Sequence, residues 1–460
     1  MLLLVINMLE NHSFEFIRLP IVRRSTTVIS KEHTTLLEPM CHHIFPLLTK
    51  NTVLRIRSNH LMKLPTQRLL SNKDFFIEFQ GYLSNHAKHA IVALDKLNAP
   101  SERIQEYWDQ YTTLTPYNLE IEHIPASWDQ VKPIEEVEWK ALRGKKEKWQ
   151  EMCSFLEQEK QVVFNGDINA LVKEYAPDLL SGLAGALAHG IIHLGWGIDA
   201  QNEWMTIEGL AYLNYCHIGV DESKWKEDAV QDDTPLDSML RIAKEYQFQN
   251  LQKTWVEESK ARLGEEFHPE LIPAGFQWNL AKVLATPHPV ATDLPTWLNN
   301  DPLDQIWKNM YQTCTLIYLA TRDKDDHGNF LILHSLTSLW GLEKVCQVIG
   351  DEAVDRRALK QFYSSLVCLL AASSSGFPTK ETLEATKLDY PFTKTDNKET
   401  YDWTPTVSAA VQEVEEHNIK LAYVAQALWE RYDQWHGFSK AASCFTLTPN
   451  IGPSTTEYKD

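Results

Sequence analysis

The amino-acid sequence predicts a mostly α-helical fold, with a single large helical domain and long connecting loops. Three observations predict it. Apolar residues recur with helical spacing through much of the chain, whereas the alternating apolar and polar runs typical of strands are sparse. Proline and glycine are concentrated in a few stretches between the helical patterns. No repeat of fixed period is present, which argues against a solenoid.

The first helical patterns lie in residues 85–111 and 138–198. In the first of these, Ile91 and Leu94 share one helix face, and Ser101 is suited to cap a following helix. In the second, we expect breaks at Asn165-Gly166 and at Ala176-Pro177. Four further helical patterns cover residues 237–263, 329–349, 356–374 and 405–435. Two stretches rich in proline, glycine or serine, residues 268–295 and 373–405, are expected to form long loops.

The ends of the chain look different from its centre. Residues 1–40 are expected to be a weakly ordered N-terminal extension, since the apolar run at residues 2–6 is too short for a signal-peptide core. Residues 41–448 form the predicted all-helical domain, and residues 449–460 read as a C-terminal tail.

Composition excludes several classes of partner. The formal net charge is -18, which argues against nucleic acid and against an anionic membrane surface. No apolar run approaches the roughly 20 residues that a membrane helix needs. The seven cysteines are scattered and odd in number, without a CxxC pair, so we expect a reducing compartment and a cytoplasmic protein. The 15 Trp, 16 Tyr and 17 Phe suit either an ordinary core or a pocket for a flat aromatic ligand.

Two histidines, His189 and His193, stand four residues apart in the apolar run AHGIIHLGWGIDAQ. On a helix this spacing places both imidazoles on one face, where they could bind one metal ion. The glutamate that follows the first histidine in the HExxH zinc motif is missing, so a hydrolytic zinc site is not the natural interpretation. Hydrogen-bonded core histidines are the alternative.

Other polar residues occur on equally apolar patterns. His86 and His89 stand three apart, His334 lies within LILHSLTSLWGL, and His417 begins a stripe that carries Lys420 one turn later. Each one has an ordinary explanation as a satisfied core or surface residue. An unpaired polar group costs about 1–3 kcal/mol to bury, so a common centre for all of them is the economical hypothesis.

Several neutral imidazoles favour Fe, Cu, Zn or Ni over Mg or Ca. Such a site leaves the charge of a dication uncompensated, so an anionic group would help. Glu208 is one candidate for it. Lys420 is another, because a buried lysine has a lowered pKa and can react with CO2 to form an anionic carbamate.

The stretch from Gly195 to Ala200 fits G-x-G-x-x-A, the dinucleotide-binding fingerprint. It follows a helical pattern and not a strand, and no βαβ pattern follows it. Asp199 would also repel a pyrophosphate. A nucleotide site here is therefore disfavoured.

Four of these stretches, in this order, resemble the questin oxidase-like family: SNHAKHAIVALDKLNAP, LAHGIIHLGWGIDA with EGLAYL after it, LHSLTSLWGL and EHNIKLAYVAQAL. The resemblance runs from about residue 76 to 435. Members often show H-P-x-I-H-L-G, and here Gly190 replaces the proline.

The resemblance implies an oxygenase that uses O2 to open a ring of an anthraquinone or other polycyclic phenol in a Baeyer–Villiger-like step. It also implies a non-haem Fe(II) centre, with NADPH as a reductant that acts on the quinone. We expect His189, His193, His334 and His417 to hold the metal, with His86 or His89 also at the site. Lys420 is expected to be an anionic ligand or a local base, and Glu208 a catalytic or supporting group.

Two other hypotheses about the function remain open. One is a metal-free monooxygenase that depends on flavin or NADPH, and the other is a non-catalytic helical interaction protein. The first predicts activity that survives chelation, and the second predicts neither bound metal nor a closed aromatic pocket.

Overall fold

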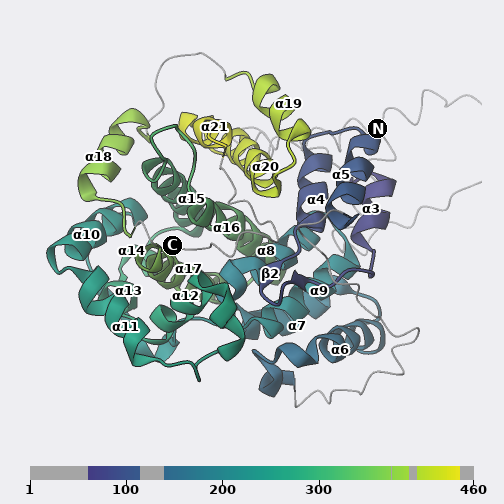
Figure 1. The fold of residues 1–460 in the computed structure, drawn as a ribbon, viewed down its shortest axis with the longest axis horizontal. Helices are drawn as coiled ribbons and strands as arrows, with labels where there is room; N and C mark the ends of the chain where they lie inside the picture. Colours follow the sequence, from purple (N-terminus) through teal and green to yellow (C-terminus); the bar gives the residue numbers. More distant parts are fainter. Residues whose placement is uncertain (1–60, 114–138, 374–375, 393–400, 446–460) are drawn as a thin grey trace, which may run out of the picture. The chain divides into compact units, whose positions relative to one another are not determined.

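The structure is a computed structural model of the chain, and it describes residues 61–113, 139–373, 376–392 and 401–445. These residues are mostly helical, as predicted, and the strands among them form only two small two-stranded sheets (Figure 1). The predicted domain boundaries at residues 40 and 448 lie outside the described residues, as does Cys41. Among the residues that the structure describes, no helix is long and apolar enough to cross a membrane.

The first part of the described chain runs from α3 to α9. Its elements are α3 (Leu64–Leu70), β1 (Glu78–Phe79), β2 (Leu83–Ser84), α4 (Ala87–Lys96), α5 (Ser101–Thr113), η3 (Trp139–Leu142), η4 (Lys146–Lys148), α6 (Trp149–Val162), α7 (Ile168–Leu179), η5 (Leu180–Gly182), α8 (Gly185–Asp199) and α9 (Glu203–Tyr215). Strands β1 and β2 pair antiparallel, with Glu78 opposite Ser84.

The middle part consists mainly of short elements. They are η6 (Glu222–Lys224), β3 (Lys226–Val230), α10 (Pro235–Phe248), η7 (Gln252–Val256), α11 (Glu257–Arg262), η8 (Pro269–Ala274), α12 (Phe276–Ala285), α13 (Pro289–Thr292), β4 (Asp293–Pro295) and α14 (Trp297–Asn300). Strands β3 and β4 pair in parallel.

Long helices return in the C-terminal part. They are α15 (Leu303–Ala320), α16 (Phe330–Ile349), α17 (Glu352–Ala372), α18 (Lys380–Asp389), α19 (Thr404–Gln412), α20 (Glu416–Arg431) and α21 (His436–Ser443).

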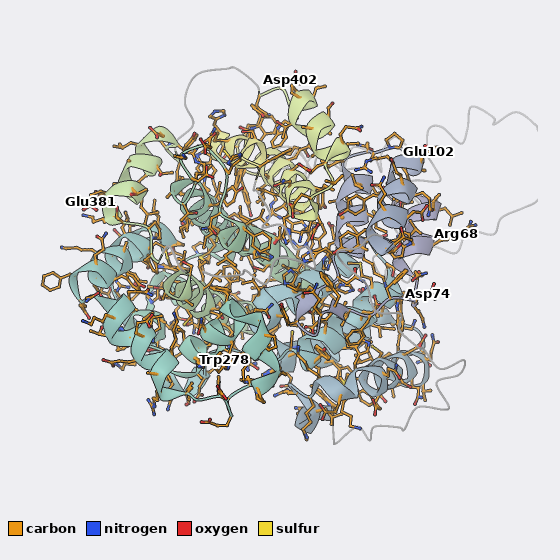
Figure 2. All side chains as sticks on the ribbon, in the orientation of Figure 1. Arg68, Asp74, Glu102, Trp278, Glu381 and Asp402 are labelled. Carbon is orange, nitrogen blue, oxygen red and sulfur yellow. The ribbon has the colours of Figure 1, made fainter. Side chains whose placement is uncertain are left out.

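Helix α8 is at the centre of the packing and contacts α9, α16, α4 and α12. Helix α20 in turn packs on α4 and α16, so segments far apart in sequence surround the same volume (Figure 1). Charged side chains such as Arg68, Glu102 and Glu381 lie outside, exposed (Figure 2), whereas α8 is apolar nearly all round and buried.

The glycines of the G-x-G-x-x-A stretch are used for helix packing. A Cβ on Gly195 would lie 2.1 Å from the carbonyl oxygen of Gly341 in α16, and a Cβ on Gly197 would lie 2.8 Å from the backbone nitrogen of Thr206 in α9. Glycine is therefore required where α8 crosses α16 and α9 backbone to backbone. Asp199 accepts hydrogen bonds from Tyr423 and Trp340 and pairs with lysines, so this stretch forms helix contacts and not a nucleotide loop.

The break at Asn165-Gly166 separates α6 from α7 as expected, with both residues at positive φ. The break expected at Pro177 is wrong, because this proline lies inside α7. Its missing N–H removes one backbone hydrogen bond of the helix, and α7 ends two residues later.

The long loops expected over residues 268–295 and 373–405 are also partly wrong, because α12, α13 and α18 lie within them. The prolines there were interpreted as helix breakers. In the structure, Pro269 and Pro289 occupy the first turn of a helical element, where a backbone N–H has no partner within the helix anyway.

Candidate metal centre

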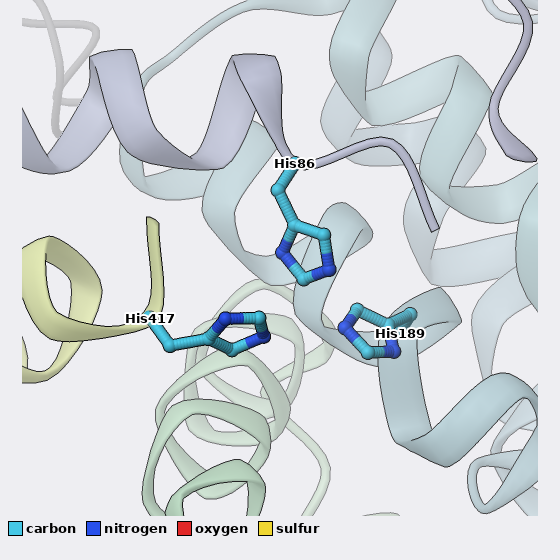
Figure 3. A group of neighbouring side chains, drawn as sticks. All are labelled: His86, His189 and His417. Carbon is cyan, nitrogen blue, oxygen red and sulfur yellow. The ribbon is translucent and has the colours of Figure 1, made fainter. Parts of the chain in front are cut away.

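Five buried histidine side chains meet between four helices. His86 and His89 come from the start of α4, His189 from α8, His334 from α16 and His417 from α20. The ring centroids are 4.6 Å apart for His86 and His189, and 4.5 Å apart for His86 and His417. His334 lies 4.8 Å from His189 and 4.9 Å from His417, again between centroids. Figure 3 shows three of the rings turned toward one another.

One nitrogen from each of His86, His189 and His417 can be chosen so that all three lie within 4.8 Å of one another. This group could hold a metal ion. A second such group combines His417 with the carboxylates of Glu415 and Glu416.

Three of the histidines share one hydrogen-bonding arrangement. The Nδ1–H of His189 donates to the carbonyl oxygen of Ala186 at 2.5 Å, and that of His334 donates to the carbonyl of Phe330 at 2.9 Å. The Nδ1–H of His417 donates to Glu415 Oε1 at 2.6 Å. In each ring the other nitrogen, Nε2, is buried and finds no hydrogen-bond partner within the described part of the chain. Metal-bound histidines use their second nitrogen in this way, which fixes the tautomer and leaves the ligating lone pair free.

His89 reaches the same state through a relay. Glu208 Oε2 lies 3.3 Å from His193 Nε2, and His193 Nδ1 lies 3.0 Å from His89 Nε2. A carboxylate only accepts, so His193 donates through Nε2 and accepts at Nδ1 from His89. The Nδ1 of His89 is then a bare lone pair, and it has no hydrogen-bond partner among the residues that the structure describes.

Burial keeps these imidazoles neutral. It is the largest cause that holds the pKa of His86, His189 and His417 well below the usual value, and the charge of Lys420 adds to it in each case. The same two causes lower the pKa of His334 to about 3. Metal binding needs the neutral form of imidazole, so the cluster is prepared for a cation without having to release protons.

Lys420 is fully buried, and its Nζ lies 2.7 Å from His86 Nδ1. Burial lowers the pKa of Lys420 to about 8, although Glu416 and Glu415 oppose this shift. Roughly a tenth of the Lys420 side chains are therefore uncharged, nucleophilic amines at pH 7, far more than for an exposed lysine.

The backbone just before His189 has an unusual conformation. Ala186, Leu187 and Ala188 have φ values of 49°, 54° and 63°, so the chain makes a left-handed turn at the start of α8. For non-glycine residues this conformation costs about 1–2 kcal/mol each. The turn places the Ala186 carbonyl against His189 Nδ1, and strain of this kind is concentrated at functional sites.

The sequence-predicted residues thus occupy two neighbouring positions. The cluster itself contains His86, His89, His189, His334, His417 and Lys420. His193 lies beside it with both ring nitrogens in hydrogen bonds, and Glu208 lies behind His193. Glu208 also accepts from Lys88 Nζ at 2.5 Å and from Trp204 Nε1 at 2.7 Å.

Sequence reasoning missed Glu415, Glu416 and Lys88. Glu415 caps α20, accepting from the backbone N–H groups of His417 and Asn418, and the same carboxylate orients the His417 ring. An acidic residue just before a histidine that begins an apolar helix is the signal that could have found it.

A family model described as Questin oxidase-like matches residues 83–425, a span that contains all of the residues above. The chain belongs to the questin oxidase-like family. Membership implies an oxidoreductase, and more closely an oxygenase that acts on anthraquinone-type substrates. A comparison with curated proteins finds no match to this chain.

Proposed function

We propose that this protein is an O2-dependent oxygenase that opens a ring of a polycyclic phenol or anthraquinone-type polyketide at a histidine-rich, non-haem iron centre. One observation carries the proposal. Four buried imidazoles, those of His89, His189, His334 and His417, each have one nitrogen with no hydrogen-bond partner in the described ranges, and their rings belong to one cluster with His86.

The donor set fits such a metal. Leaving several polar atoms unpaired in a core costs about 1–3 kcal/mol each, and this cost is removed when a cation accepts their lone pairs. His189, His334 and His417 would hold it through Nε2, and His89 through Nδ1, with His86 beside them. Neutral imidazoles with few carboxylates suit iron, which supplies activation of O2 when bound.

Charge balance gives Lys420 its role. The Nζ of Lys420 lies 2.7 Å from His86 Nδ1, so a protonated Lys420 would repel a cation held by this cluster, and the site favours an uncharged or anionic form of this side chain. In the anionic form, the amine of Lys420 attacks CO2, a C–N bond forms, one proton is released and the product is a carbamate. The fully buried position protects the carbamate from water.

The remaining residues hold the rings and exclude water. The carbonyls of Ala186 and Phe330 and the carboxylate of Glu415 fix three tautomers, and Glu208 fixes a fourth through His193. A dry site strengthens each of these interactions. NADPH is proposed to act before ring opening, by reducing the quinone to a hydroquinone, because the fingerprint stretch around Gly195 is occupied by helix packing.

The proposal is tested by supplying reduced 1,8-dihydroxyanthraquinone and 18O2 to the purified protein, with O2 uptake and product mass as the two measurements. We expect substrate-dependent O2 uptake, a ring-opened product that carries 18O, loss of both after chelation, and recovery with Fe(II). His417→Ala should be inactive, whereas His327→Ala, at a half-buried position outside the cluster, should be active. Activity that survives chelation in a flavin-coloured protein would instead support the metal-free monooxygenase.

A further inference from the structure

A pocket lies directly beside the histidine cluster, between the left-handed turn of α8, α12, α16 and α17. It contains about 370 Å³ of empty space that is partly open to solvent, and its inner cavity is about 30 Å³. His334 and Ala188 are among its lining residues, so the pocket adjoins one candidate metal ligand, His334, and the residue that precedes a second, His189. The inner cavity has about the volume of one water molecule, so only the edge of a ligand can enter it, and the rest of the ligand lies in the part that is open to solvent.

Most of the pocket wall is apolar. Leu187 from the left-handed turn, Leu280 from α12, and Leu366 and Leu369 from α17 contribute to it. In α17 the apolar residues Phe362, Leu366 and Leu369 follow at helical spacing, so one face of this helix lines the pocket. Walls of this kind take up an aromatic ring and exclude a charged ligand.

One polar stripe crosses this wall. Ser335 and Ser338, on the same helix as His334, donate their hydroxyl protons to the backbone carbonyls of Ile332 and His334, at 2.7 Å and 2.5 Å. Their oxygens keep lone pairs that can accept hydrogen bonds. Ser365, from α17, also lines the pocket and is only 7% exposed, but its Oγ, unlike theirs, has no hydrogen-bond partner among the described residues.

We infer that this pocket binds the edge of a planar phenolic ring, and that Ser365 recognises its hydroxyl group and so determines substrate specificity. An unpartnered buried hydroxyl is costly, and a phenol oxygen or proton supplies the missing partner. The leucines contact the two faces of the ring. This inference rests on the proposed function, since it assigns the pocket to the substrate of the same centre.

The test compares 1-naphthol with naphthalene, two planar probes that differ by one hydroxyl group. Binding is measured under argon by probe fluorescence, with the protein as purified, and the metal content of each sample is recorded. Three variants are used: Ser365→Ala, Leu369→Trp, and Ser364→Ala as the matched control. Ser364 is the neighbouring residue in α17, with a buried unpartnered hydroxyl too, but it does not line the pocket.

We expect Ser365→Ala to weaken 1-naphthol binding by about three- to tenfold and to leave naphthalene binding unchanged. Leu369→Trp should weaken both probes by at least about tenfold, because the indole fills the pocket. Ser364→Ala should change neither. Equal binding of 1-naphthol to the wild type, Ser365→Ala and Leu369→Trp would overturn the inference, as would equal losses in Ser364→Ala and Ser365→Ala.

The two proposals fail in different ways. Protein that contains metal but shows no Ser365-dependent binding contradicts the pocket assignment alone. Protein that binds the probes as expected but contains no transition metal contradicts the proposed function and leaves a phenol-binding pocket.

Discussion

Replacing Glu208 by Gln tests whether the relay behind the cluster prepares it for a metal. The carboxylate is buried and accepts from Lys88 at 2.5 Å, from Trp204 at 2.7 Å and from His193 at 3.3 Å. Burial raises the pKa of Glu208, but the opposing effects of Lys88 and His193 are larger together and the pKa lies below its usual value. The group is therefore a carboxylate at neutral pH, and Gln removes its charge with little change in shape.

Two separate effects are expected. The variant leaves the Lys88 ammonium, whose side chain is only 10% exposed, without its counter-ion, which should cost about 3–5 kcal/mol of stability. It also removes the acceptor that fixes the tautomers of His193 and His89. Loss of such an outer partner typically lowers metal affinity by about 10–100-fold. Urea unfolding measures the first effect, and competition with a fluorescent chelator measures the second.

The double variant Glu208→Gln/Lys88→Met separates the two effects. It removes both charges, so stability should recover in large part, whereas metal affinity should remain low because the relay is still broken. Lys88→Met alone should keep most of the metal affinity. Wild-type metal affinity in the double variant would refute the relay.

Three further predictions follow from the geometry. Lys420→Ala should lose most of its bound metal and regain it when a small carboxylate such as acetate is added, and full occupancy without acetate would exclude the carbamate. Gly195→Ala should lower the unfolding free energy by about 3 kcal/mol or more, because the added Cβ would lie 2.1 Å from the carbonyl oxygen of Gly341. A Tm within about 2 °C of the wild-type value would contradict this close approach. Below pH 6.5 the unfolded chain takes up a proton at His334, whereas the folded chain, in which the pKa of His334 is about 3, does not. The unfolding free energy of the metal-free protein should therefore fall as the pH is lowered from 6.5. His334→Leu should reduce the slope of unfolding free energy against pH by about 1.4 kcal/mol per pH unit. Equal slopes in urea unfolding from pH 7 to 5 would contradict the last prediction.

Much of the arrangement could be predicted from sequence because polar residues on apolar helices are expensive to bury. His334 is surrounded by apolar residues in its own helix, and the same holds for His189 and His417, so a shared polar centre was the economical explanation. The helical fold followed from periodicity for the same reason, since α8 and α16 must be buried on nearly every face.

Which histidines keep a nitrogen free for a metal, and which only support them through hydrogen bonds, could not be predicted from the sequence. His193 and His89 are 104 residues apart, and which of them keeps a free nitrogen depends on a hydrogen bond between them and on Glu208 behind. Helical spacing alone places His189 and His193 on one face and predicts that both are metal ligands. Only the tertiary contacts distinguish them.

The left-handed turn at residues 186–188 also lacks a local signal. Its residues are Ala, Leu and Ala, none of which favours positive φ. The neighbouring Gly185 shows why the chain is held there, because its Cβ would lie 1.5 Å from the carbonyl oxygen of Cys216. Packing between distant segments imposes this conformation, and no single stretch of sequence encodes it.

The most direct test of the proposed metal centre is the metal content of freshly prepared protein that has not been exposed to a chelator. It is measured by elemental analysis for the wild type, His189→Ala and His327→Ala. We expect about one iron per chain in the wild type and in His327→Ala, and a large loss of iron in His189→Ala. A folded wild-type protein without a stoichiometric transition metal, or an unchanged metal content in His189→Ala, would contradict it.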